Sequence, residues 1–168
     1  MKRIIKTALA ASLLLLSGFT AAQDEAPDVD PKYTWDLSEI YSSEEDWDQA
    51  RKEVLAELEN IIALRGTLGE SADQLYRAAM LISDTSRKAS RVYAYASLMA
   101  DEDLRVTSDQ ERRQLAQAMF AQFGEATAWV QPEILRVGEE TIKSFIREDE
   151  RLERFAYELD NAVRNAPH

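Results

Sequence analysis

The sequence contains no cysteine, and its only histidine is the final residue, His168. Without cysteine, neither a disulfide nor a Cys-His pair can form. One terminal histidine supplies neither a pair of zinc ligands nor a Ser-His-Asp arrangement. We therefore predict no catalytic residue, no cofactor-binding residue and no metal ligand in this chain, and neither tight zinc binding nor peptide cleavage by the chain alone.

Glycine and proline are also scarce, with 5 and 4 copies among 168 residues. Both residue types are common in the many turns of an all-β fold, so their scarcity disfavours such a fold. No segment alternates polar and apolar residues in the way a half-buried strand does.

Positive charge is in the minority, since 20 lysines and arginines are set against 31 aspartates and glutamates, for a net charge of −11. This balance disfavours nucleic acid and anionic lipid as partners. No segment has the spaced Asp, Asn and Gly residues of a calcium-binding loop. We interpret the excess carboxylates as a solvated surface.

Residues 1–22 have the three regions of a secretory signal peptide: a basic start, an apolar run over 8–16 and small residues up to Ala22. The run is shorter than the roughly 20 residues that span a bilayer, so a membrane anchor is less favoured. We predict cleavage after Ala22, a periplasmic or secreted location and no membrane association of the mature chain. Cleavage would remove Lys2, Arg3 and Lys6 and change the net charge to −14.

An extended acidic leader is predicted over 23–41, because Pro27 and Pro31 stand among carboxylates without periodic apolar residues. Trp35 lies in this leader and must find a surface to bury against. We expect it to hold the leader against a helix.

Helix signals follow the leader. Ser42-x-x-Glu45 and Ser43-x-x-Asp46 are overlapping capping boxes, and Gly66 is a stop signal. Between them runs an apolar stripe at helical spacing. The stripe consists of Trp47, Ala50, Val54, Leu58, Ile61 and Ile62.

Ser71-x-x-Gln74 begins a second helical pattern, which Asp84-Thr85-Ser86 could divide in two. Its apolar positions are Leu75, Ala78, Ala79, Ile82, Ala89, Val92, Tyr93, Ala96 and Met99. Ser108-x-x-Glu111 is expected to cap another helix, which Pro132 ends. Its inward positions are predicted to be Leu115, Ala118, Met119, Phe123, Ala126 and Val130.

After Gly138, a short apolar pattern contains Ile142, Phe145 and Ile146, and a last helix is predicted to carry Leu152, Phe155, Leu159 and Val163. The fold class is therefore all-α, an up-and-down array of five or six helices in a domain over 42–168. A solenoid is less favoured, because the stripes differ in length and in aromatic positions.

Two acidic clusters, Glu44-Glu45-Asp46 and Asp101-Glu102-Asp103, could be mistaken for acid–base sites. The first lies in the opening turn of a helix, where carboxylates favour the helix dipole, so we interpret both as structural. The aromatic residues are predicted to lie in the core or at interfaces. They are Trp35, Trp47, Trp129, Tyr93, Tyr95 and Tyr157.

A family resemblance rests on several motifs that occur in one order. These are Trp35-Asp36-Leu37-x-x-Ile40-Tyr41-x-Ser43-x-x-x-Trp47, Arg65-Gly66-x-Leu68, Tyr93-x-Tyr95-Ala96-Ser97-Leu98 with Ala100-Asp101-Glu102-Asp103, and Pro167-His168. Together they resemble the N-terminal part of the oligoendopeptidase F family, whose members are zinc metallopeptidases that cleave short peptides.

The resemblance implies that zinc and catalysis belong to a later helix with His-Glu-x-x-His and a downstream glutamate. None of these positions exists in this chain, so no catalytic residue is carried over. The part present here is expected to form a helical wall of the substrate channel, with the missing catalytic domain as its partner and oligopeptides as substrates through that domain. A truncated product or a domain fragment is the simplest interpretation.

Two other interpretations stay open from the sequence. The chain could be a free-standing exported helical module with a binding or chaperone-like role, or a purely structural exported bundle. A coding sequence for His-Glu-x-x-His beyond His168 would distinguish the enzyme fragment from both.

Overall fold

The computed structural model describes residues 35–164, which form six α-helices and one 3-10 helix and, within this range, no strand. The predicted all-α class is confirmed. The predicted signal peptide and the Pro167-His168 landmark lie outside the described residues. None of the helices within them combines the length and the hydropathy that crossing a bilayer requires.

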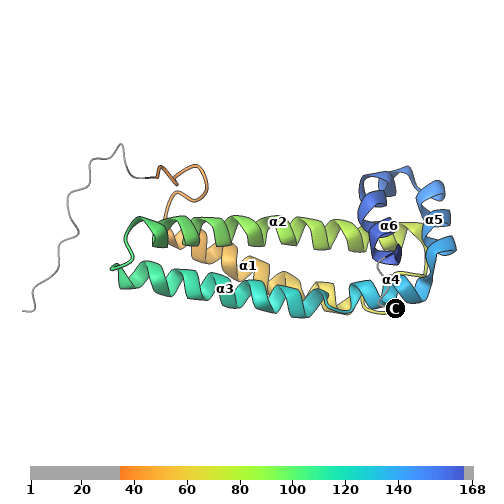
Figure 1. Cartoon of the computed structure of the whole chain (residues 1–168), viewed down its shortest axis with the longest axis horizontal. Coiled ribbons are helices and arrows are strands. Elements are labelled where there is room, and N and C mark those ends of the chain that lie inside the picture. Colours follow the sequence, from red (N-terminus) through yellow and green to blue (C-terminus); the bar gives the residue numbers. More distant parts are fainter. Residues whose placement is uncertain (1–34, 165–168) are drawn as a thin grey trace, which may run out of the picture.

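Three long helices form a bundle in which the chain direction alternates (Figure 1). They are α1 (Glu44–Ala63), α2 (Ala72–Glu102) and α3 (Thr107–Thr127). With 31 residues at a rise of about 1.5 Å each, α2 is the longest helix of the bundle. It runs along the whole bundle, and its start lies among the shorter helices (Figure 1). The core of the bundle contains Trp47, Val54, Val92, Ala96 and Met119.

Four short elements pack around the start of α2 and form a helical cap (Figure 1). They are α4 (Val130–Val137), α5 (Glu139–Glu148), the 3-10 helix η2 (Glu150–Phe155) and α6 (Ala156–Arg164). The cap has an apolar core of its own, which buries one face of α2 against it. This core contains Leu68, Leu75, Ala78, Ile134, Ile142, Leu152 and Leu159.

Two predicted helix starts are confirmed. The Ser43 hydroxyl accepts a hydrogen bond from the backbone N–H of Asp46, and the Ser71 hydroxyl accepts one from that of Gln74, both at 3.1 Å. Each serine therefore satisfies one of the N–H groups that a helix start leaves without a partner.

The possible break at Asp84-Thr85-Ser86 does not occur, because α2 is continuous over 31 residues. The Thr85 hydroxyl lies 2.8 Å from the carbonyl of Leu81, one turn earlier, and 2.7 Å from a carboxylate oxygen of Glu57 on α1. Thr85 is completely buried. Its hydroxyl is thus satisfied inside a helix, so it does not compete with the backbone.

The boundaries predicted for the third helix are wrong. The N-cap is Val106, without a side-chain hydrogen bond, so Ser108 lies in the first turn instead of capping it. Pro132 does not end α3, which stops at Thr127, but occupies the first turn of α4. A proline is tolerated there because its missing N–H would have no partner within the helix.

Several predicted burials also differ. Leu115 is 46% exposed, whereas Arg112 on the same helix is 6% exposed and forms ion pairs with Glu44 and Asp109. Ala118 is likewise exposed. Tyr157 is exposed, so of the two positions predicted for it, core or interface, the core is excluded. Leu152 and Phe155 lie on η2, not on the last helix.

The leader is held differently from the prediction. Trp35 is 60% exposed, and its backbone N–H donates a hydrogen bond to Glu102 at 2.6 Å. The buried residue is Leu37, which packs into the bundle core beside Trp47. The indole of Trp35 therefore does not hold the leader, and the smaller Leu37 does.

Candidate interaction site

The described residues contain no group of three His, Cys, Asp or Glu side chains that could hold a metal ion. His168 lies outside this range. Residues 35–164 therefore do not by themselves fit a zinc ion, whose sites use three or four such ligands.

The two acidic clusters are engaged in structural contacts. The hydrogen bonds that Arg105 donates to Asp103 lower the pKa of this carboxyl from 3.8 to about 2. Asp101 pairs with Arg113. A general acid needs a raised pKa, and Asp103 has the opposite shift. The first cluster occupies the first turn of α1.

Glu133 is a buried carboxylate that the sequence did not single out. It is 2% exposed and accepts hydrogen bonds from the backbone N–H groups of Gly66 at 2.7 Å and Leu68 at 2.9 Å. Gly66 has a positive φ of 94°, a conformation that favours glycine. The Arg65-Gly66-x-Leu68 motif therefore wraps around a carboxylate of α4 and fixes the cap to the end of α1.

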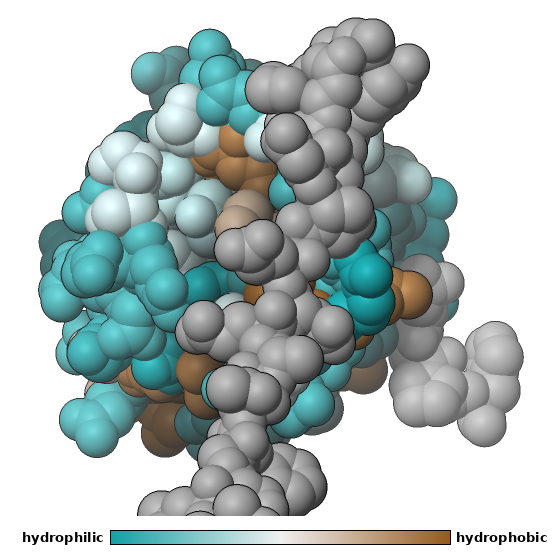
Figure 2. Space-filling model, turned by 90° about the vertical axis from the view of Figure 1, so that its left-hand side faces the viewer, coloured by the Kyte–Doolittle hydropathy of each residue, from teal (hydrophilic) through white to brown (hydrophobic). Residues whose placement is uncertain are grey.

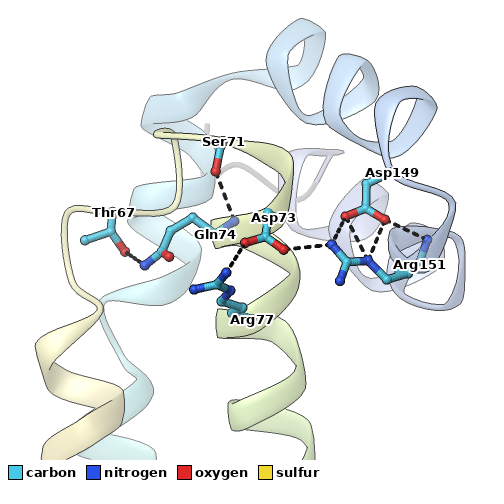
Figure 3. A network of polar contacts seen from close by, with 7 residues as sticks. All are labelled: Thr67, Ser71, Asp73, Gln74, Arg77, Asp149 and Arg151. Atoms are coloured by element: carbon cyan, nitrogen blue, oxygen red, sulfur yellow. Dashed lines mark hydrogen bonds and ion pairs between the residues drawn. The ribbon is translucent and has the colours of Figure 1, made fainter.

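A second set of polar contacts fixes the cap to α2 (Figure 3). The Arg151 guanidinium of η2 donates to Asp149 at 2.6 Å and to Asp73 of α2 at 2.8 Å. It also lies over the ring of Tyr76, 4.3 Å from the centroid. Asp73 in turn pairs with Arg77. These contacts orient the cap relative to the bundle.

A row of aromatic side chains lies on the surface where α2 and α3 meet. The row consists of Tyr93, Phe120 and Phe123, with ring centroids 5.5 Å apart between Tyr93 and Phe120 and 6.3 Å apart between Phe120 and Phe123. Tyr93 and Phe120 are each 37% exposed. We call this set the aromatic row.

An apolar groove of about 690 Å³ continues from the aromatic row, since Phe123 belongs to both. It runs between α2, the end of α3 and the cap. Its apolar lining residues include Leu75, Ile82 and Phe155. The aromatic row and the groove therefore form one extended apolar surface.

Apolar side chains are distributed differently at the end of the bundle where α2 passes into α3. Seen from that end, hydrophobic residues are visible among hydrophilic ones (Figure 2). Leu104, in the connection from α2 to α3, is 71% exposed. A continuous apolar strip of several side chains marks a docking surface more strongly than such isolated residues do.

Comparison with known proteins gives a consistent result. A family model described as Oligopeptidase F matches residues 133–168. Group B oligopeptidase PepB of Streptococcus agalactiae is 30% identical over 145 residues, which cover 86% of this chain and 24% of that protein. Oligopeptidase PepF of Bacillus subtilis is 30% identical over 158 residues, which cover 90% of this chain and 24% of that protein.

Solved structures agree with the sequence matches. The crystal structure of oligoendopeptidase-F from Enterococcus faecium superposes with a TM-score of 0.68 at 28% identity, covering 73% of this chain and 24% of that one. A putative peptidase from Chlamydophila abortus, at 21% identity, shares the fold with a TM-score of 0.67, over 82% of this chain and 23% of that one. The chain thus spans about a quarter of the length of these relatives.

Proposed function

Because the chain belongs to the oligoendopeptidase F family, we propose that it is the N-terminal helical part of an exported zinc oligoendopeptidase that hydrolyses short peptides. In this proposal the bundle forms a wall of the substrate channel. The catalytic domain of the full-length enzyme is the partner of this chain. Oligopeptides are substrates through that domain.

The observation that carries the proposal is the extent of the sequence match. The alignments with two oligopeptidases cover 86% and 90% of this chain at 30% identity, so the likeness extends over nearly all of it. The extended apolar surface supports the same proposal, because a helical bundle that packs on another domain needs such a face.

Zinc enters the proposal only through the full-length enzyme. The described residues offer no set of three ligands, so the proposal assigns metal binding and peptide hydrolysis to the catalytic domain. The role of this chain is then steric and positional: it packs on that domain and limits which peptides can enter the substrate channel.

A chimeric enzyme tests the proposal directly. The N-terminal quarter of Bacillus subtilis oligopeptidase PepF is replaced by this chain from Gln23 onward, and hydrolysis of a quenched fluorescent peptide is measured. We expect chelator-sensitive hydrolysis by the chimera and a strong loss of it when the N-terminal quarter is deleted. A matched chimera that carries Phe120→Glu tests the contribution of the aromatic row.

A chimera that is folded by circular dichroism, binds zinc and yet is as inactive as the deletion would contradict the proposal. Such a result would favour the alternative, a free-standing exported helical module with a binding or chaperone-like role.

A further inference from the structure

A second cleft, of about 760 Å³, lies between α1, α3 and α4, and its lining combines apolar and charged side chains. Leu55, Leu58 and Ile62 of α1 supply apolar surface, and Ile62 is 51% exposed there. The cleft is in the size range of small-ligand sites. We call it the charged cleft.

Four charged residues line the charged cleft, namely Arg65, Arg136, Glu59 and Glu125. Within residues 35–164, none of them has an ion pair or a hydrogen bond from its side chain. Other arginines of this acidic chain do find carboxylates: Arg112 pairs with Asp109, and Arg151 with Asp149. The cleft thus leaves two positive and two negative groups available to a ligand.

The charges are arranged with opposite signs toward opposite ends. Helices α1 and α3 both run toward α4 (Figure 1). Glu59 of α1 precedes Arg65, which lies just after the end of α1, and Glu125 of α3 precedes Arg136 of α4. The glutamates therefore lie near the ends of the two bundle helices, and the arginines lie farther along the chain, at or within the cap.

Buried Glu133 fixes the positive end. Arg65 directly precedes Gly66, whose N–H is bonded to Glu133, and Arg136 follows Glu133 by one turn of α4. A single carboxylate thus holds the backbones that carry both guanidinium groups, which lowers the entropy cost of binding one ligand with both.

From this arrangement we infer that the charged cleft binds a small zwitterion with apolar side chains, of the size of an unblocked apolar dipeptide. The ligand carboxylate lies toward Arg65 and Arg136, its ammonium group lies toward Glu59 and Glu125, and its side chains cover Leu58 and Ile62. All of these residues belong to this chain, so the inference can be tested on it independently of the proposed function.

The test is a titration of the ¹⁵N-labelled chain with leucyl-leucine, followed through the indole N–H signal of Trp129, whose side chain lines the cleft. Trp129→Phe assigns this signal. We expect a saturable shift with a dissociation constant on the order of 1 mM, since the charged contacts are exposed to water. The same dipeptide blocked at both ends should bind about tenfold more weakly.

Substitutions complete the test. Arg65→Gln and Arg136→Gln should each weaken binding about threefold or more, whereas Arg147→Gln, an exposed arginine of α5 outside the cleft, should match the parent. Circular dichroism checks that each variant is folded. Equal binding of the blocked peptide, an equal effect of Arg147→Gln, or no saturable shift up to about 20 mM ligand would each overturn the inference.

Discussion

The buried carboxylate of Glu133 accepts a hydrogen bond from the backbone N–H of Gly66 at 2.7 Å, across 67 positions of sequence. Its second oxygen accepts from the N–H of Leu68 at 2.9 Å. Both donors lie in the connection between α1 and α2. This connection contains no helix, so no helical hydrogen bond is available to these two N–H groups. One side chain of α4 therefore completes the hydrogen bonding of a loop near the start of the chain.

We predict that Glu133→Ala lowers the free energy of unfolding by about 3 kcal/mol, because two shielded N–H donors lose their acceptor. Glu133→Gln should cost less, since its carbonyl oxygen can still accept one bond. Urea unfolding followed by circular dichroism measures both changes. Glu111→Gln, an exposed carboxylate on α3, is the matched control. A Glu133→Ala variant as stable as that control would contradict the assigned role.

The local features of the fold could be predicted from the sequence. The capping serines Ser43 and Ser71 and the apolar stripe of α1 are set by neighbours within a few residues, so the sequence pattern contains the information. The same holds for the all-α class, which needs only the spacing of apolar residues.

Features that depend on distant residues could not be predicted. Glu133 resembles any surface glutamate in the sequence, because its donors are 65 and 67 positions away. A helix break at Thr85 is compatible with the sequence alone, because the contact that accommodates its hydroxyl comes from Glu57 on another helix. The same reason applies to Leu115 and Arg112, whose exposure depends on how α3 is rotated against α1.

Arg151 provides a second prediction. Arg151→Gln removes ion pairs to Asp73 and Asp149 and the contact with the Tyr76 ring. Because its side chain is 49% exposed, water screens these contacts and we expect only a small loss of stability. Thermal unfolding at low salt and in about 1 M salt measures it, and the loss should shrink in high salt. Arg147→Gln should show no comparable loss at either salt concentration.

The pH dependence of stability can be predicted at Glu57. Partial burial would raise the pKa of this carboxyl, but hydrogen bonds from Lys88 and Thr85 outweigh it and lower the pKa below 4.5. A lowered folded-state pKa gives stability that is complete above the unfolded value and is lost as the pH falls through the folded value. Glu57→Gln should therefore be less stable than the parent at pH 7, by about 1 kcal/mol, with a difference that shrinks below pH 4.5.

Urea unfolding of parent and Glu57→Gln at several pH values measures this difference. Comparing the two proteins cancels the contribution of other carboxyls with lowered pKa, such as Asp48. Glu111→Gln is again the control. A stability difference that is constant from pH 7 to pH 3 would show that Glu57 does not titrate with the proposed shift.

Export is predicted to remove residues 1–22, given their basic, apolar and small-residue regions. Mass spectrometry of the chain recovered from the periplasm or the medium should find a start within two residues of Gln23. Recovery of exported protein that begins at Met1 would contradict the prediction.

The last prediction concerns the apolar surface formed by the aromatic row and the adjoining groove. Tyr93 and Phe120 are each 37% exposed, and Phe123 leads into a groove of about 690 Å³. Exposed apolar surface of this extent binds hydrophobic dyes and favours association, although a net charge of −14 after cleavage at Ala22 would oppose self-association. We expect the isolated chain to be helical by circular dichroism and yet to bind such a dye or to self-associate.

Phe120→Glu should lower dye binding and association several-fold, because it places a charge at the centre of the aromatic row. The matched control is Leu104→Glu, at a residue that is more exposed, at 71%, but lies outside the row; it should leave both nearly unchanged. Fluorescence titration and analytical ultracentrifugation measure the two properties. Addition of the separately produced catalytic domain should suppress dye binding by the parent chain but not by Phe120→Glu. If the parent chain is instead monomeric, silent toward the dye and sharply cooperative in unfolding, its apolar surface needs no partner, and the free-standing module becomes the better interpretation.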